Sequence, residues 1–200
     1  MAIITEARRE RRARTREATR AAILEAARRV ATRDGARNLS LRAAAAEAGF
    51  APAALYSYYA SKNDLLLALA ADDLAVISRA LRSAPQTHNG ATPLAAASSA
   101  ALTLLQSTES IAAASAALPC NPGSGESERH FNGRLIAVLT ALSRAMGGNM
   151  KNRTEQVDVL LLVAALTGLA VLARSGRLAA LGFSTEEAIA RLDARFSPAV

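Results

Sequence analysis

The side chains of this chain that are best suited to binding chemistry are three tyrosines and a lysine. Tyr56, Tyr58 and Tyr59 are its only tyrosines, and Lys62 follows them in the segment LYSYYASKND. A tyrosine combines an apolar ring with a hydroxyl donor, and a lysine ammonium group has three donors and no acceptor. These groups favour contacts with the phosphate oxygens of a nucleic acid. The alternative is that the tyrosines are core aromatics of a small domain.

An enzyme is the competing interpretation of the reactive residues. Cys120 could act as a nucleophile with His130 or His88 as its base, but the surrounding LPCNPGSG shows no catalytic pattern. A single cysteine also excludes an intramolecular disulfide and a multi-cysteine metal site. We therefore expect no enzyme activity, no metal ion and no cofactor.

The net positive charge of the chain is confined to its first third. Residues 1–62 contain 12 Arg and 1 Lys against 6 acidic residues, which accounts for the net charge of +7, and residues 63–200 balance 11 basic against 11 acidic residues. Segregated charge of this kind indicates an anionic partner at that end of the chain. An arginine-rich arm over residues 1–14 is either a disordered solubilising tail or, as we expect, a segment that lies along phosphates or enters a minor groove. Its arginines, with the one that follows it, are Arg8, Arg9, Arg11, Arg12, Arg14 and Arg16.

The elements that position these residues are predicted to be helices, because alanine dominates and β-branched runs are short. The first clear helix spans about residues 15–33 and ends at Gly35. Ser40 is an N-cap for a short helix that ends at Gly49, and Pro52 opens a second short helix over about residues 52–59. Two short helices joined by a glycine-containing turn are typical of a helix-turn-helix unit, whose second helix lies in the DNA major groove.

The order SLRAAAAEAGFAPAALYSYYASKNDLL also resembles the DNA-binding region of TetR-family transcriptional regulators over about residues 15–68. The family pattern is a small polar cap, then A-x-x-A-G-V, a short helix ending in L-Y-x-Y/H-F, and S-K-x-x-L. The matching residues are Ser40, Ala45, Ala48, Gly49, Leu55, Tyr56, Tyr58, Ser61, Lys62 and Leu65. The resemblance implies an all-α fold with a DNA-binding domain in residues 1–62 and a helical effector-binding and dimerisation domain in residues 63–200.

The resemblance and the residue types together assign roles within the first domain. Tyr59 occupies the family's usual Phe position, so we expect it in the core. Between Gly49 and Ser61 there is no Arg, Lys, Asn or Gln, the usual base readers, and Ala51 stands where many relatives have serine. Indirect readout is therefore expected to contribute more than usual. The expected phosphate contacts are Ser40, Tyr56, Tyr58 and Lys62, and the expected base contacts are Arg42, Pro52, Ala53 and Ser57.

The most apolar segment, residues 159–173, is interpreted as a buried helix, since 15 residues fall short of the roughly 20 that cross a bilayer. In the family, the two C-terminal helices pair with their copies in a second subunit. The segments at about 153–175 and 184–196 suit that role, and a monomer core helix is the alternative. The small residues expected at the dimer interface are Ala164, Ala165, Gly168 and Ala170.

The function that follows is a cytoplasmic, dimeric, ligand-responsive DNA-binding regulator. We expect a repressor that binds a pseudo-palindromic operator and is released by a small apolar or amphipathic effector enclosed by helices between about residues 67 and 150. The sequence does not identify that effector, and the groups considered for its pocket are Cys120, His130, Phe131 and Arg134. A non-specific nucleic-acid binder is the other alternative.

Overall fold

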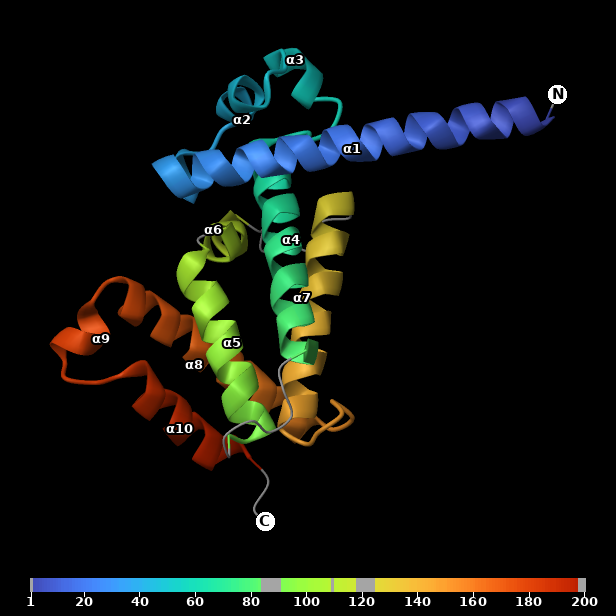
Figure 1. Cartoon of the computed structure of the whole chain (residues 1–200). Helices are drawn as coiled ribbons and strands as arrows, with labels where there is room; N and C mark the ends of the chain where they lie inside the picture. The colour runs from blue at the N-terminus through green and yellow to red at the C-terminus, as the bar shows by residue number, and fades with distance from the viewer. Residues whose placement is uncertain (1, 84–90, 109, 118–124, 198–200) are drawn as a thin grey trace. The chain divides into compact units, whose positions relative to one another are not determined.

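The computed structural model describes residues 2–83, 91–108, 110–117 and 125–197, which contain helices and turns and no strand. This is the predicted all-α fold (Figure 1). The elements are α1 (Ala2–Asp34), a 3-10 turn η1 (Ala36–Asn38), α2 (Leu41–Ala48), α3 (Pro52–Leu55), α4 (Lys62–Ser83), α5 (Pro93–Ser107), α6 (Ser110–Ala117), α7 (Glu126–Ala145), α8 (Arg153–Arg174), α9 (Arg177–Ala180) and α10 (Thr185–Phe196).

Backbone proximity divides the chain into two compact units. The first comprises Met1–Ala70 with Ser110–Glu128, and the second comprises Ala71–Glu109 with Arg129–Val200. The first unit therefore includes α6 as well as the N-terminal helices, and α4 contributes residues to both units.

The core of the first unit is formed by the second half of α1 together with α2, α3 and the start of α4. Ile23, Val30, Leu55, Tyr59 and Leu65 are all completely buried. Each buried side chain of this size stabilises the fold by about 1.5–3 kcal/mol. The burial of Tyr59 confirms its prediction as a core residue.

The helix-turn-helix segment is shaped by local capping, as predicted. The Ser40 hydroxyl accepts a hydrogen bond from the Ala43 N–H at 3.0 Å, which caps α2. Gly49 ends α2 in the left-handed region at φ 74°, and the Phe50 N–H returns to the Ala45 carbonyl at 2.9 Å. Such a backbone conformation favours glycine because a Cβ atom is strained there. Pro52 then opens α3 at its first position.

Two helices differ in length from the predictions. The arginine-rich arm is not a separate arm, because α1 continues without a break from Ala2 to Asp34. Ala, Arg and Glu are strong helix formers, and neither Gly nor Pro interrupts the segment. The helix predicted over residues 52–59 is shorter than expected: α3 ends at Leu55, and a hydrogen-bonded turn follows in which the Tyr58 and Tyr59 N–H groups both donate to the Leu55 carbonyl at 2.9 Å.

The second unit has α5 packed against α8, and α10 packed against both. Leu94 and Leu102 of α5 and Leu162 and Leu166 of α8 are almost completely buried. α10 begins with a capping box, because the Ser184 hydroxyl accepts from the Glu187 N–H and the Glu187 carboxylate accepts from the Ser184 N–H.

The prediction that the apolar segment at 159–173 is a buried helix is wrong in part. α8 is 22 residues long, and only 22% of its most apolar 18-residue window is buried. By length and composition alone, α8 could therefore cross a membrane. The prediction had excluded this because the apolar segment 159–173 contains only 15 residues. Its two faces differ: one packs into the second unit, and the other leaves large apolar side chains exposed.

Candidate DNA-binding surface

The recognition segment of the first unit exposes residues of several kinds. Arg42 on α2 and Pro52 and Ala53 on α3 are exposed, whereas Leu55 of α3 is completely buried. Leu55 therefore anchors α3 to the core, and the first turn of α3 remains free to meet a ligand. α3 is thus held to the core at its C-terminal end and exposed at its N-terminal end.

The three tyrosines separate into different environments. Tyr56 is 62% exposed, so its hydroxyl is free to meet a ligand in solvent. Tyr58 is half-buried beneath the guanidinium group of Arg16, which lies 5.3 Å from the centre of its ring. The Arg20 guanidinium lies 5.1 Å from the centre of the Tyr59 ring. Cation–π contacts of this kind hold both rings against α1.

Arg16 forms a second contact that the sequence did not reveal. Its Nη2 atom donates a hydrogen bond to the Ser57 carbonyl at 3.0 Å, across 41 residues of sequence. Ser57 itself donates its hydroxyl to the Ala54 carbonyl at 2.7 Å. The Ser57 oxygen can still accept a hydrogen bond, so in this conformation the side chain is an acceptor for a base or phosphate partner. Arg16 therefore positions the turn after α3 and is not a member of a loose arm.

Lys62 is the first residue of α4 and is exposed. Its ammonium group donates a hydrogen bond to the backbone carbonyl of Arg37, which lies in the 3-10 turn η1 just before α2. Because an ammonium group has three donors, two remain for an anion. The Ser61 hydroxyl accepts from the Asp64 N–H at 3.1 Å and so caps α4, while the Asp64 carboxylate accepts from the Ala60 N–H at 3.0 Å.

An ion-pair cluster at Glu47, near the C-terminal end of α2, fixes that helix to α1. Glu47 accepts from Arg29 Nε at 2.8 Å and from Arg33 Nη1 at 3.0 Å. Hydrogen bonds from Arg29, then Arg33, hold the pKa of Glu47 below its ordinary value. Two of the arginines in the basic third of the chain are thus engaged within the protein and contribute less to attracting an anion.

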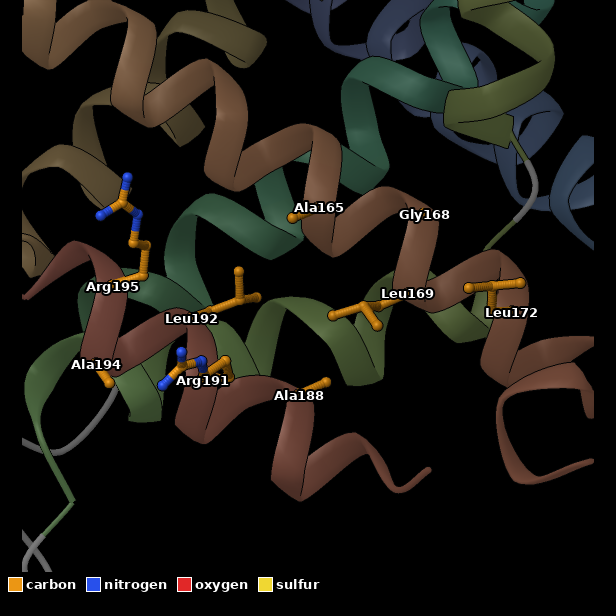
Figure 2. Close-up of a pocket in the computed structure, with 9 residues that line it drawn as sticks. All are labelled: Ala165, Gly168, Leu169, Leu172, Ala188, Arg191, Leu192, Ala194 and Arg195. Carbon is orange, nitrogen blue, oxygen red and sulfur yellow. The ribbon is translucent and has the colours of Figure 1, made fainter. Parts of the chain in front are cut away.

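A groove in the second unit lies between α8 and α10 (Figure 2). Its volume is about 720 Å³, and leucine and alanine side chains form most of its wall, with Arg191 and Arg195 at its edge. Gly168 lines it, and a Cβ atom added there would meet nothing within 4 Å. This groove lies outside residues 67–150, where an effector pocket is expected.

The comparisons with known proteins agree with this geometry. Residues 23–69, from the buried half of α1 to the first turns of α4, match the family model described as bacterial regulatory proteins, tetR family. That segment contains both helices of the helix-turn-helix unit and the tyrosine turn. The chain has the fold of a TetR-family transcriptional regulator.

Solved structures extend the likeness over the whole TetR-type fold. A protein with unknown function from Rhodococcus sp. RHA1 is 23% identical, with 89% of this chain and 93% of that chain covered and a TM-score of 0.68. A transcriptional regulator from the same source is 20% identical (88% and 95% covered, TM-score 0.62), and a TetR family transcription regulator from Marinobacter aquaeolei VT8 is 19% identical (91% and 95% covered, TM-score 0.59). At these identities the likeness establishes the fold. No curated protein matches the chain significantly.

The residues predicted for the dimer interface and the effector pocket lie in different environments. Ala164 and Gly168 are exposed on α8, and Ala165 is half-buried in the groove. Ala170 is only 4% exposed because it lies on the inner face of α8, so it does not suit a dimer interface. Among the residues considered for an effector pocket, Phe131 is buried, His130 and Arg134 are exposed, and Cys120 lies outside the described residues, as does His88.

Sequence reasoning missed the residues that hold the surface together. Arg20, Arg29 and Glu47 contact side chains that are distant in the sequence, and no local pattern signals such pairs. Among the described residues, no group of three or more His, Cys, Asp or Glu could hold a metal ion.

Proposed function

We propose that this chain is a ligand-responsive repressor that binds a pseudo-palindromic operator as a homodimer in the cytoplasm. The observation that carries the proposal is the exposure of Arg42, Pro52, Ala53 and Tyr56 on a helix-turn-helix unit that matches the TetR family. The accumulation of all net charge in residues 1–62 supports a polyanionic partner for this surface. We assign DNA binding to residues 1–62 and effector binding and dimerisation to residues 63–200.

The phosphate contacts are proposed to come from the ends of the recognition segment. Tyr56 and Lys62 have donors available to solvent. Tyr58 lies between them in the sequence, and Ser40 is the N-cap of α2. Such contacts fix the register of the protein on the duplex without reading its sequence.

Base recognition is proposed to depend on the first turn of α3 and on α2. Pro52 and Ala53 would contact thymine methyl groups, Ser57 would accept a hydrogen bond, and Arg42 would reach a base edge. Because no other strong base reader occurs between Gly49 and Ser61, DNA shape should contribute a large part of specificity.

The outer face of α8 is the surface that we propose pairs with a second copy. Leu160, Leu161 and Val171 are between 45% and 54% exposed, and on a helix they share one face with Ala164 and Gly168. Exposed apolar side chains in this number are unusual for a monomer surface and mark an interaction site. The groove between α8 and α10 adjoins this face and would receive side chains of the partner (Figure 2).

Dimerisation has a functional reason as well. One short recognition helix contacts only a few base pairs, so two half-sites are needed for useful affinity. A closed two-fold symmetric dimer presents the two helices to a pseudo-palindromic operator.

A membrane is the other environment that the exposed apolar face of α8 could meet. A concentration-dependent dimer in aqueous buffer would distinguish dimerisation from membrane binding.

The effector is proposed to be small and apolar or amphipathic, because the described helices between residues 67 and 150 are rich in Ala and Leu and carry few aromatics. Its binding would favour the conformation with low operator affinity. Compounds of this class should then weaken operator binding in a titration without denaturing the chain.

The decisive experiment is selection of bound fragments from genomic DNA. A pseudo-palindromic motif with two half-sites would support a specific dimeric regulator, and its spacing would give the separation of the recognition helices. Recovery of fragments without a motif would instead favour a non-specific nucleic-acid binder. Labelling Cys120 with iodoacetamide should leave operator binding intact, because the proposal gives that thiol no role.

A further inference from the structure

The first half of α1 is a helical rod that extends beyond the core of its own unit. Every side chain from Arg8 to Ala18 is exposed, and burial begins only at Ile23. The family match also begins at residue 23. At about 1.5 Å per residue, residues 2–22 extend over about 30 Å. Figure 1 shows this part of α1 continuing past α2 and α3 without covering another element of the first unit.

Five of the seven arginines in residues 2–22 form a ridge along one side of the rod. Arg8, Arg12, Arg16 and Arg20 are spaced by four residues, so each is rotated by only about 40° from the one before it. Arg9 lies seven residues before Arg16 and is rotated from it by about 20°.

The acidic residues of the rod occupy a different side. Glu6, Glu10 and Glu17 fall within about 40° of one another, roughly 120° away from the centre of the arginine ridge. Two arginines lie off the ridge: Arg14 is near the acidic side, where it pairs with Glu10 at 3.9 Å, and Arg11 lies between Arg14 and the ridge. No acidic residue falls on the ridge itself, so that side of the rod is strongly basic.

The ridge faces the side of α1 that holds the recognition segment. Arg16 binds the Ser57 carbonyl and stacks on Tyr58, and Arg20 stacks on Tyr59, so both point toward the turn that carries the exposed Tyr56. Arg8, Arg9 and Arg12 continue the same side outward, where they have no hydrogen bond or ion pair with any described residue.

We propose that the basic ridge of α1 binds the phosphate backbone of the duplex that flanks each half-site. The proposal rests on the proposed function, because the DNA must first dock on α3. An α-helix is about 10–12 Å across and the minor groove is about 6 Å wide, so the rod cannot enter that groove as the sequence alone allowed. Arginine side chains bind phosphate oxygens in pairs of hydrogen bonds, which suits a ridge laid against the backbone.

The geometry sets the length of flanking DNA that matters. Arg8 lies twelve residues before Arg20, or about 18 Å along the helix axis. At about 3.4 Å per base pair, that distance corresponds to about five base pairs beyond the recognition turn. Operator affinity should therefore rise with flank length up to about six base pairs on each side and then level off.

The experiment measures operator affinity on duplexes with flanks of zero, six and twelve base pairs, at several salt concentrations. The wild type should gain about tenfold between zero and six base pairs. A triple variant with Arg8→Ala, Arg9→Ala and Arg12→Ala should lose this gain and lower the salt slope on the long duplex by about 5, from three contacts in each of two subunits. The matched control removes the same charge from exposed arginines of the second unit that lie outside α8, through Arg79→Ala, Arg144→Ala and Arg177→Ala.

A second variant separates the helical rod from a flexible charged tail. Ala13→Pro keeps every arginine but breaks the helix between Arg12 and Arg16, and Ala13→Gln is the control that keeps the helix. Loss of the flank effect in the proline variant alone supports the rod. Full retention of the flank effect in that variant overturns it.

The outcomes also separate this inference from the proposed function. Tight, sequence-specific binding to the duplex without flanks, with no gain from longer flanks, overturns only the ridge proposal. Absence of binding to every duplex contradicts the proposed function itself. An equal flank effect in the wild type and the triple variant also overturns the ridge proposal.

Discussion

Replacement of Gly168 by leucine gives the sharpest test of the proposed dimer. Gly168 lies on the exposed face of α8, and a Cβ atom built there meets nothing within 4 Å in its own chain. Within a monomer the added Cβ atom therefore meets no steric obstacle. It should even stabilise the helix, because glycine in a helix interior is about 1 kcal/mol less favourable than a good helix former.

The expected effect on the dimer is large and opposite in sign. A leucine that must fit into a packed interface costs about 1–3 kcal/mol through overpacking. A two-fold interface contains the residue twice, so the total is about 2–6 kcal/mol. This raises the dimer dissociation constant by a factor of about 30 to 10⁴.

The assay is sedimentation or light scattering over a range of protein concentration, together with thermal melts followed by circular dichroism. Gly168→Leu should shift the population toward monomer, keep the helical spectrum and lose the dependence of melting temperature on concentration that a dimer shows. Gly133→Leu is the matched control, because Gly133 is also exposed on a helix with nothing within 4 Å of an added Cβ. A variant that dimerises as tightly as the wild type, or a wild type that is monomeric at micromolar concentration, would refute the reasoning.

Three further predictions concern the DNA-binding unit. Tyr56→Phe should weaken binding to specific and scrambled duplexes alike by about 1 kcal/mol, with an unchanged melting temperature because the side chain is 62% exposed; a lowered melting temperature with unchanged affinity would show a structural role instead. Lys62→Ala should also act without regard to sequence and lower the salt slope by about one unit per contact, whereas Ser57→Ala should change the preferred base and leave the slope alone; the same titrations decide both. Glu47→Gln should lower the melting temperature at pH 7. The difference from the wild type should shrink as the pH falls below about 4.5, because folding lowers the pKa of Glu47 and the stability that its carboxylate contributes is lost as the carboxylate becomes protonated. A pH-independent difference would show that the ion pairs of Glu47 do not contribute.

Much of the candidate site was predictable from the sequence because its features are local. The cap at Ser40, the left-handed Gly49 and the position of Pro52 each depend on a few neighbouring residues, and all lie where the sequence placed them. The helical state of the arginine-rich segment was equally local, since Ala, Arg and Glu favour helix over the whole stretch. The prediction that residues 1–14 form an arm separate from the first helix was wrong.

Contacts between distant segments were beyond the sequence. The pairing of Arg16 with Ser57 and of Glu47 with Arg29 depends on how α1 crosses α2 and the tyrosine turn, and many other arginines offered the same chemistry. The lengths of the helices and the order of polar and apolar residues do not specify which guanidinium group reaches which carbonyl or carboxylate group.

The sequence by itself determined the helices, the turn between α2 and α3 and the segregation of charge, because propensity, capping and residue type act over a few residues. Only the tertiary structure decided which face of each helix is covered. On α8 both faces are apolar, so periodicity predicts burial all round. α8 packs against α5 and α10, and Leu162 and Leu166 are buried whereas Leu160 and Leu161 are exposed. A face is buried only where another element reaches it, and that depends on the positions of residues far away in the chain.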